Sequence, residues 1–252
     1  MRFQFSLRGP GVRAAYPVQS APRGPLTEKK VRKQAARIFR FLFPHGYPGE
    51  VFLCGGAFKP ALHPKLRTND IDLWVRDRKE RNRLLKFLLK RGATLDRDFH
   101  PFCLRLLLNG CAVEITYHNI KNGTLEELVH SFDIAGCAIG ARYNHRGIRE
   151  TYISPGAYET VATGEVILEE AYMKSLVNER LPTVLRGIDR MQTFAHETGL
   201  RIRKRDIETL WAIYFHNYTV EEQRKCVDVY LETTVGFKRG CNKELLQRAT
   251  AA

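Results

Sequence analysis

The chain has 252 residues, with 41 Lys and Arg against 27 Asp and Glu and a formal net charge of +14. A content of 44% hydrophobic and 10% aromatic residues excludes wholesale disorder, because that much apolar side chain can bury a core. No apolar run in the sequence approaches the roughly 20 residues that a membrane helix needs. The positive charge favours polyanionic partners such as nucleic acid, phosphorylated substrates or an anionic membrane surface, and it argues against cationic substrates.

The N-terminal stretch 1–26 is predicted to be a basic, flexible arm. It contains no Asp or Glu, and its arginines are interleaved with Gly and Pro. Three interpretations stay open: an organelle transit peptide, an RNA-contacting arm, or a disordered start.

The six cysteines lie apart, without a C-x-x-C pair, which argues against a zinc cluster and a dense disulfide framework. We therefore expect the cytoplasm or another reducing compartment, with organelle import left open by the arm.

The segment 27–165 is predicted to form a compact head. Thr27 can cap a helix over 28–43, whose apolar residues recur on one face. The hairpin signal is Asn109-Gly110, a two-residue turn between apolar runs. The remaining head elements that we predict are strands at 51–53 and 71–75, a helix over 78–91, hairpin strands at 102–108 and 111–117, a short helix at 124–130, and strands at 134–143 and 148–153.

Beyond Glu165 the pattern changes to helices, which defines a helical C-terminal region over 166–252. The predicted helices run over 168–180, 183–198, 204–216 and 220–231. The expected fold class is therefore α/β (α+β): a head with a small mixed sheet flanked by helices, followed by a helical region.

Three carboxylates and a glycine pair form the most informative pattern of the head. Asp70 and Asp72 stand at i and i+2 of one predicted strand, so their side chains face the same side and can share oxygen-ligated Mg²⁺. Glu114 comes from a later strand and can complete such a site. The pair Gly55-Gly56 ends a strand and lets the backbone approach a phosphate closely. This set of groups is typical of phosphoryl or nucleotidyl transfer.

Each part alone is a weak signal, because surface strands often carry Asp-x-Asp and a Gly pair is usually a turn. The combination is stronger. Asp70 and Asp72 alternate with apolar residues in a strand that must be half buried, and carboxylates on a buried sheet are costly unless they are paired or bind a metal.

These motifs resemble the polymerase-beta-type nucleotidyltransferase superfamily. The run CGGAFK at 54–59, followed by NDIDLW at 69–74, is similar to its signature of Gly-Gly, a spacer and Asp-x-Asp. Within it, the head of CCA-adding enzymes and bacterial poly(A) polymerases is the closest likeness, with Gly-Gly-x-Val-Arg-Asp and Asp-Ile-Asp-Leu. SFDIAGCA at 131–138 stands where that group has Arg-Arg-Asp-Phe-Thr-x-Asn-Ala. The resemblance covers roughly residues 30–165.

The chain departs from that group at several positions. Lys59-Pro60 stands in place of Arg-Asp, Ser131-Phe132 in place of the Arg pair, and Cys137 in place of Asn. The family residues help to hold the nucleotide, so these changes bear on nucleotide binding. Glu114 replaces the commoner Asp and can still bind metal or accept a proton. For Asp133 we expect capping or a hydrogen bond at a strand start rather than chemistry.

Cations are needed for a triphosphate and an RNA end. Candidates for the nucleotide are Lys59 and Arg67, on the connection between the Gly pair and Asp70, together with helical Lys174, Arg186 and Arg190. Related nucleotidyltransferases often direct a helical Lys or Arg to the triphosphate. The basic run Arg201, Arg203, Lys204 and Arg205 suits an RNA backbone, and a solvated helix start is the alternative.

The function that the resemblance implies is Mg²⁺-dependent, template-independent transfer of a nucleoside monophosphate from an NTP to an RNA 3′ end, with tRNA or a tRNA-like end as the expected acceptor. Asp70, Asp72 and Glu114 would be the catalytic and metal-binding residues of a two-metal site, with Mn²⁺ as an alternative ion. Gly55 and Gly56 would contact the nucleotide. Other hypotheses are a small nucleotidyltransferase toxin or antitoxin that modifies tRNA or a protein, a catalytically silent RNA-binding module, and an adapter for an acidic partner.

Overall fold

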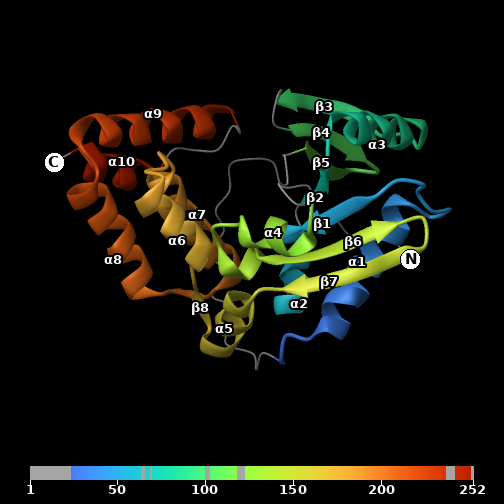
Figure 1. Ribbon diagram of the computed structural model, residues 1–252, viewed down its shortest axis with the longest axis horizontal. Coiled ribbons are helices and arrows are strands. Elements are labelled where there is room, and N and C mark those ends of the chain that lie inside the picture. Colours follow the sequence, from blue (N-terminus) through green and yellow to red (C-terminus); the bar gives the residue numbers. More distant parts are fainter. Residues whose placement is uncertain are drawn as a thin grey trace.

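The computed structural model describes residues 24–63, 66–68, 70–99, 103–117, 123–236 and 242–250. Its centre is a seven-stranded sheet with the strand order β3-β4-β5-β2-β1-β6-β7 (Figure 1). β2 and β5 are parallel and all other neighbours are antiparallel. The strands are β1 (Val51–Cys54), β2 (Asp70–Val75), β3 (Thr94–Phe99), β4 (Cys103–Leu108), β5 (Cys111–Tyr117), β6 (Ile139–Asn144) and β7 (Gly147–Ile153).

The helices are α1 (Glu28–Leu42), α2 (Lys59–Leu62), α3 (Arg78–Lys90), α4 (Leu125–His130), α5 (Pro155–Thr163), α6 (Glu170–Asn178), α7 (Val184–Thr198), α8 (Lys204–Ala212), α9 (Val220–Gly236) and α10 (Lys243–Thr250). Short 3₁₀ turns lie at Gly55–Phe58 and Ala135–Cys137, and a π turn, Ile213–Asn217, extends α8. A two-stranded parallel pair, β8 (Glu165–Val166) and β9 (Arg201–Ile202), links the end of the head to the helical region. Within the described segments, no helix combines the length and the apolar character needed to cross a bilayer.

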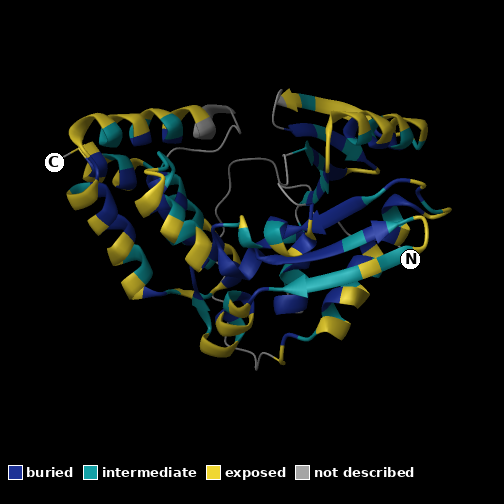
Figure 2. Cartoon of the chain, viewed as in Figure 1, coloured by how far each residue is buried: buried dark blue, intermediate teal, exposed yellow. Residues whose placement is uncertain are grey.

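Both faces of the sheet are covered by other elements, so the head has one hydrophobic core on each side of the sheet. The odd-numbered residues Ile71, Leu73 and Val75 of β2 belong to a large core that also contains Leu42 of α1 and Leu84 of α3. On the other face, residues of β1 and α4 form a second, smaller core of Phe52, Cys54, Leu125, Leu128, Val129 and Ala138. Figure 2 shows the buried strands in dark blue between the exposed outer faces of the helices.

Local sequence explains most of these elements. The Thr27 side chain caps α1 by accepting a hydrogen bond from the backbone N–H of Lys30 at 3.3 Å, as predicted. Asn109 and Gly110 both have positive φ, as a two-residue hairpin turn requires, and Leu108 pairs with Cys111 across them. The predicted helices and strands up to 130 are therefore confirmed within a few residues.

The strand predicted over 134–143 was wrong in its first half. The chain turns at Ala135–Cys137, where the backbone N–H of Ala135 donates to the carbonyl oxygen of Ile167 at 2.8 Å, and β6 begins only at Ile139. The apolar run is buried on all sides, so its hydrophobicity did not distinguish a strand from a buried turn. Further elements were not predicted: the edge strand β3, which is mostly polar, the helices α2, α5 and α10, and the short strands β8 and β9.

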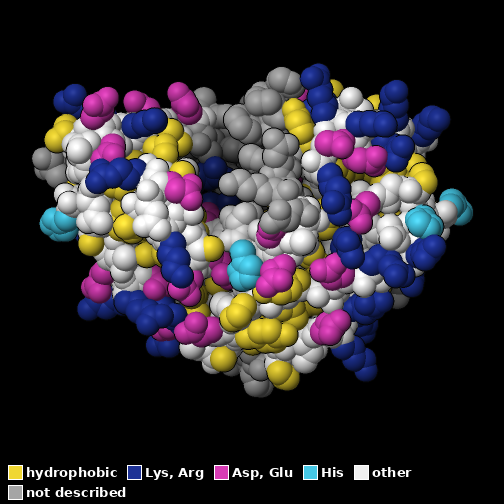
Figure 3. Space-filling model, viewed as in Figure 1, with side chains coloured by type: hydrophobic (Ala, Val, Ile, Leu, Met, Phe, Trp, Pro, Cys, Tyr) yellow, Lys and Arg dark blue, Asp and Glu magenta, His cyan; other side chains and the backbone are white. Residues whose placement is uncertain are grey.

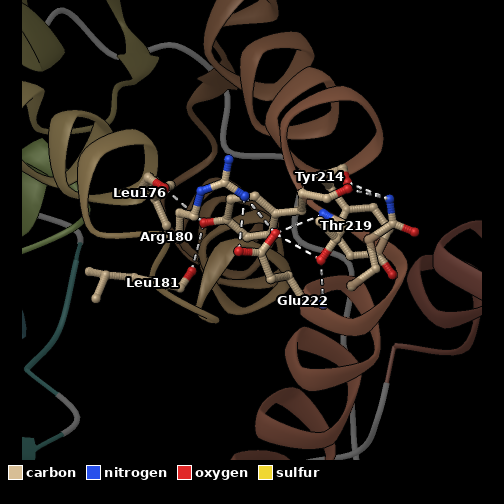
Figure 4. Close-up of polar contacts among 8 residues, drawn as sticks. Leu176, Arg180, Leu181, Tyr214, Thr219 and Glu222 are labelled. Carbon is tan, nitrogen blue, oxygen red and sulfur yellow. Dashed lines mark hydrogen bonds and ion pairs between the residues drawn. The ribbon is translucent and has the colours of Figure 1, made fainter.

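The helical C-terminal region is tied to the head by a shared core. The large core that contains α1 also contains Leu176 of α6, Ile188 of α7, Leu210 of α8 and Leu245 of α10. The loop between α6 and α7 is held by Tyr218, whose hydroxyl donates to the carbonyl oxygens of Leu176 at 2.9 Å and Leu181 at 2.8 Å. Figure 4 shows this junction, in which Arg180 also reaches Glu222 at the start of α9.

Candidate active site

The carboxylates predicted from the sequence lie side by side on the sheet. Asp70 and Asp72 are half-buried and alternate with the fully buried Ile71 and Leu73, so both project from the face opposite α1 and α3. β5 runs parallel to β2 and places Glu114 in register with Asp72. The Glu114 side chain is 16% exposed. Three acidic side chains thus share one face of two adjacent strands.

The glycine pair lets the backbone approach these carboxylates closely. Gly55 has φ of +75°, a conformation that favours glycine, and a Cβ there would lie 3.0 Å from Asp72 Oδ2. A Cβ at Gly56 would lie 3.6 Å from Asp70 Oδ1 and 3.6 Å from Lys59 Nζ. Gly55 is itself buried, and a Cβ there would also lie 3.1 Å from the Phe132 ring, whereas Gly56 is partly exposed. The two glycines therefore let the backbone lie directly against Asp70, Asp72 and Lys59.

The electrostatics of the site are dominated by negative charge. Burial, together with the neighbouring charges of Asp70 and Glu114, raises the pKa of Asp72 well above its ordinary value, although Arg190 and Lys59 act in the opposite direction. A buried carboxylate that is repelled by its neighbours is the setting that a divalent cation relieves. Asp70 and Asp72 supply the hard oxygen ligands that Mg²⁺ takes, so this pair fits the ion.

Glu114 already has a cationic partner. Arg105 on β4 pairs with it across the hairpin, with 3.1 Å between Arg105 Nη1 and Glu114 Oε1, and Arg105 Nε lies 3.4 Å from Asp96 Oδ2. Within the described part of the chain, no group of three or more His, Cys, Asp or Glu side chains is arranged to hold a metal ion. The fit to Mg²⁺ therefore rests on Asp70 and Asp72.

Lys59 lies close to the carboxylates and forms an ion pair with a residue of the helical region. Its Nζ is 2.7 Å from Glu197 Oε2 on α7 and 5.8 Å from the centre of the Phe194 ring. Burial by itself lowers the pKa of Lys59, but the charge of Glu197 and the hydrogen bond that Lys59 donates to it, with Cys137 and Asp70, raise that pKa overall. Lys59 is thus a fixed, protonated cation at the edge of the site.

Asp133 and Arg190 form a second buried link between head and helical region. Asp133 Oδ1 accepts a hydrogen bond from the backbone N–H of Ile134 at 2.9 Å, in agreement with the structural role expected for it. Its Oδ2 lies 3.0 Å from Arg190 Nε on α7. The positive charge of Arg190 also acts on Asp72, so α7 brings this cation to the carboxylates.

The thiols of Cys54 and Cys137 near the site are buried. Burial raises the pKa of Cys54 well above its usual range, and the Asp72 charge adds to this effect. Burial also raises the pKa of Cys137 to about 12 in spite of Lys59 and Arg190. Both side chains therefore stay protonated at neutral pH.

The other predicted cations are dispersed. Arg67 is exposed. Lys174 pairs with Glu170 on the surface of α6, where its side chain is 68% exposed, and Arg186 stands one turn before Arg190 on α7.

The basic run before α8 divides in two. Arg203 is buried at the start of the helix, 2.5 Å from Glu159 and 3.4 Å from Glu165. The side chains of Arg201, Lys204 and Arg205 are 80%, 86% and 74% exposed. Three of these residues therefore remain accessible to an RNA backbone, and Arg203 serves the packing of the head against α8.

Two residues of the site, Arg105 and Glu197, were not predicted from the sequence. Arg105 had a signal, since a two-residue turn at Asn109-Gly110 sets the register that places it opposite Glu114. Glu197 had none, because its contact with Lys59 joins positions 138 residues apart.

Comparison with known proteins gives a match at the level of the fold. No protein-family model matches the chain, and no curated protein matches it in sequence. A solved structure of a CCA-adding enzyme with CTP aligns with a TM-score of 0.56 at 17% identity, covering 91% of this chain and 55% of the enzyme. A CCA-adding enzyme complex with ATP aligns at 0.56 and 17%, covering 84% and 52% of the two chains. The Thermotoga maritima CCA-adding enzyme with tRNA aligns at 0.53 and 18%, covering 82% and 51%.

The chain spans about half the length of the enzymes that it matches. Identities of 17 to 18% show a likeness of fold alone. The chain therefore has a fold similar to that of CCA-adding enzymes.

Proposed function

We propose that this protein is a Mg²⁺-dependent nucleotidyltransferase that joins a nucleoside monophosphate from an NTP to the 3′ hydroxyl of an RNA. The observation that carries the proposal is the position of Asp70 and Asp72 on one face of β2, beside the backbone of Gly56 and Gly55, with Asp72 in register with Glu114. The fold that it shares with CCA-adding enzymes supports the same reaction class.

The proposed reaction is an in-line displacement at phosphorus. The 3′ hydroxyl oxygen attacks the α-phosphorus of the NTP, the bond from that phosphorus to the oxygen bridging the β-phosphate breaks, and pyrophosphate leaves with the electron pair. The hydroxyl proton passes to a carboxylate, for which Glu114 is the candidate, or to solvent. Bound Mg²⁺ supplies charge neutralisation at the phosphates.

The residues of this chain would divide the work of positioning. Asp70 and Asp72 would hold the metal, and the backbone N–H groups of Gly55 and Gly56 would face the phosphates. Lys59 and Arg190 would contribute positive charge from the edge of the site. Glu114 would serve as proton acceptor only when Arg105 releases it, because a carboxylate bound to a guanidinium is a weaker base.

The acceptor that we propose is tRNA or a tRNA-like end. A net charge of +14 favours a polyanion, and the neighbouring structures include a CCA-adding enzyme in complex with tRNA. Arg201, Lys204 and Arg205 are exposed at the start of α8 and are the candidate contacts to its backbone.

A second candidate function is an RNA-binding module that does no chemistry. Two ion pairs favour it, because Arg105 neutralises Glu114 and Glu197 neutralises Lys59 in the described structure. Such a module would bind RNA without divalent metal and would not bind NTPs.

The test is incubation of the purified chain with total RNA, Mg²⁺ and each α-labelled NTP in turn. The Asp70→Asn/Asp72→Asn variant removes both charges with little change in volume, and Glu221→Gln/Glu232→Gln on exposed positions of α9 is the matched control. We expect one RNA class to be labelled from one NTP by the wild type and the control, and no label with the aspartate variant.

The remaining outcomes separate the alternatives. Label on a protein instead of RNA would indicate a protein-modifying transferase of the toxin or antitoxin type. If no label appears with either Mg²⁺ or Mn²⁺ and RNA binding persists in EDTA, the result would support the RNA-binding module without catalytic activity and contradict the transferase.

A further inference from the structure

The outer face of α1 is a row of cations. Lys29, Lys33 and Arg40 recur at helical spacing and are exposed, as are Arg32 and Arg37, whereas Val31, Ala35, Ile38 and Leu42 point into the core. The one acid of the helix, Glu28, accepts a hydrogen bond from Thr151 at 2.9 Å. This face therefore carries a strong local excess of positive charge.

The outer face of α3 repeats the arrangement. Lys79, Arg83, Lys86 and Lys90 recur at i, i+4, i+7 and i+11 and are exposed, and Leu84 and Leu88 are buried. The acidic residues of this helix are confined to its first turn, where Asp77 caps the N-terminus and Glu80 pairs with Arg83 at 2.9 Å. Beyond that turn, the exposed charges of α3 are all positive.

Both rows lie on the side of the sheet away from the carboxylates. α1 and α3 cover the face of β2 that presents Ile71 and Leu73, whereas Asp70 and Asp72 project from the opposite face. Figure 3 shows Lys and Arg side chains gathered along the right-hand edge of the molecule, over these two helices. The basic rows are thus separate from the candidate active site.

The C-terminal ends of the two helices meet. Arg91, which follows α3, donates a hydrogen bond from Nη1 to the carbonyl oxygen of Phe41 at 2.9 Å, and a second to that of Leu42. Phe87 of α3 packs edge-on against Phe43 at 5.7 Å and Tyr47 at 5.1 Å between ring centres. The basic rows therefore converge on one point of the surface.

A pocket of about 570 Å³ opens at that point, a volume within the range of small-molecule sites. The residues that line it include His45, Tyr47, Phe87, Arg91 and His145. His45 and His145 are exposed, and Arg146 Nε donates a hydrogen bond to His145 Nε2 at 3.2 Å, so both imidazoles lie at the surface where a planar group could stack. Tyr47 is only 2% exposed, and its hydroxyl has no hydrogen-bond partner among the described residues.

We propose that this surface, formed by α1, α3 and the pocket between their ends, binds single-stranded nucleic acid, with the phosphates along the cation rows and one unstacked base in the pocket. Cation rows that flank an aromatic and histidine-lined pocket are the combination that single strands need, because charge follows the backbone and rings stack on bases. A lipid surface would match the charge but has no planar group for the pocket. This inference does not depend on the proposed transferase activity.

The first experiment measures fluorescence anisotropy of a labelled 12-nucleotide single-stranded RNA with the full chain. Lys33→Glu/Lys86→Glu reverses one exposed charge in each row, and Arg224→Glu/Lys225→Glu on α9 is the control with the same change in net charge. We expect the row variant to lose about tenfold or more in affinity and the control to lose less than threefold. Equal losses in the two variants would overturn the proposal, since they would indicate binding to net charge alone.

The second experiment tests the pocket. His45→Ala/His145→Ala alters two exposed side chains and should leave folding intact. We expect a loss of about threefold or more for the single strand and none for duplex RNA of equal length, whose bases stay stacked. An equal loss for both RNAs would contradict base binding.

Two further arms separate this surface from other sites and ligands. The Asp70→Asn/Asp72→Asn variant should bind the single strand as tightly as the wild type does, which distinguishes this surface from the candidate active site. Vesicles with phosphatidylserine should not compete with the RNA. Stronger binding of the vesicles than of RNA, lost in Lys33→Glu/Lys86→Glu, would assign the surface to membranes instead.

Discussion

At the scale of single residues, Asp72 is held in a position that disfavours its charge. It is buried beside Asp70 and Glu114, and its pKa lies well above the ordinary value of 3.8. The folded state therefore binds more protons than the unfolded state between these two pKa values. The free energy of unfolding must fall as the pH rises through that window and stay level above it.

Asp72→Asn should raise the free energy of unfolding at pH 7 by about 1 to 2 kcal/mol, because the amide carries no charge to desolvate or repel. The gain should shrink as the pH falls from the raised pKa of Asp72 toward its ordinary value of 3.8, because the folded wild type binds a proton at Asp72 in that range. Urea unfolding at several pH values measures this, with the exposed Asp228→Asn as control. A destabilised Asn variant would contradict the assigned electrostatics.

Removing one partner of the Asp133–Arg190 ion pair should destabilise the fold, in contrast to the stabilisation expected for Asp72→Asn. Arg190→Met leaves the Asp133 carboxylate, whose side chain is 11% exposed, with a hydrogen bond from Ile134 but no cation. We expect a loss of about 2 kcal/mol, less than for a fully buried pair because the Arg190 side chain is 30% exposed and partly screened.

A double-mutant cycle with Asp133→Asn isolates that interaction. The double variant should be more stable than the sum of the two single losses predicts, by about 1 kcal/mol. Additive losses would mean that the two side chains act on stability independently.

At the scale of elements, α7 connects the helical region to the candidate site. Arg190, Phe194 and Glu197 recur at i, i+4 and i+7, so one face of α7 reaches Asp133 and Lys59. The negative charge of Glu197 offsets the charge of Lys59 beside the carboxylates. The charged residues of α7 therefore contribute to the net charge at the candidate site.

Glu197→Gln should tighten the binding of Mg²⁺-ATP by about threefold, because the amide can still accept a hydrogen bond from Lys59 but no longer cancels its charge. Isothermal titration of the wild type, this variant and the exposed Glu221→Gln control tests the effect. Weaker binding in Glu197→Gln would show that Glu197 acts by orienting Lys59 rather than by neutralising it.

The loop between α6 and α7 is held by Tyr218, which directly follows the π turn Ile213–Asn217. The Tyr218 hydroxyl is the donor to Leu176 and Leu181, and Tyr218 is 5% exposed (Figure 4 shows the two acceptors). Tyr218→Phe should lower the free energy of unfolding by about 1 to 2 kcal/mol, since two carbonyls lose a buried donor. Thermal unfolding measures it, and Tyr158→Phe, at a tyrosine that is 45% exposed, should have no effect.

At the scale of the whole molecule, head and helical region share a core that runs from Leu26 to Ala249. We therefore expect the described parts to unfold in one transition. The chain has two tryptophans, Trp74 in β2 and Trp211 in α8, one in each part.

Trp211→Phe leaves a reporter in the head, and Trp74→Phe leaves one in the helical region. In each variant the fluorescence and far-ultraviolet circular dichroism transitions in urea should coincide, because the shared core couples the parts. A fluorescence midpoint that is separated from the dichroism midpoint in either variant would indicate that head and helical region unfold independently.

The sequence by itself determined the local features. The cap at Thr27, the Asn109-Gly110 turn and the alternation that directs Asp70 and Asp72 to one face are set by residues within a few positions of each other, and all are confirmed. The resemblance to nucleotidyltransferases rested on the same short motifs and holds at the level of the fold. Residues 1–23 of the predicted arm lie outside the described residues.

Only the tertiary structure decided which charges meet. It paired Lys59 with Glu197, Asp133 with Arg190 and buried Arg203 with Glu159, and it converted the first half of the strand predicted over 134–143 into a turn. Helix and turn preferences depend on neighbouring residues and can be read along the chain. The partner of a charge, and the side on which an apolar run is covered, depend on packing between distant segments, which local spacing does not encode.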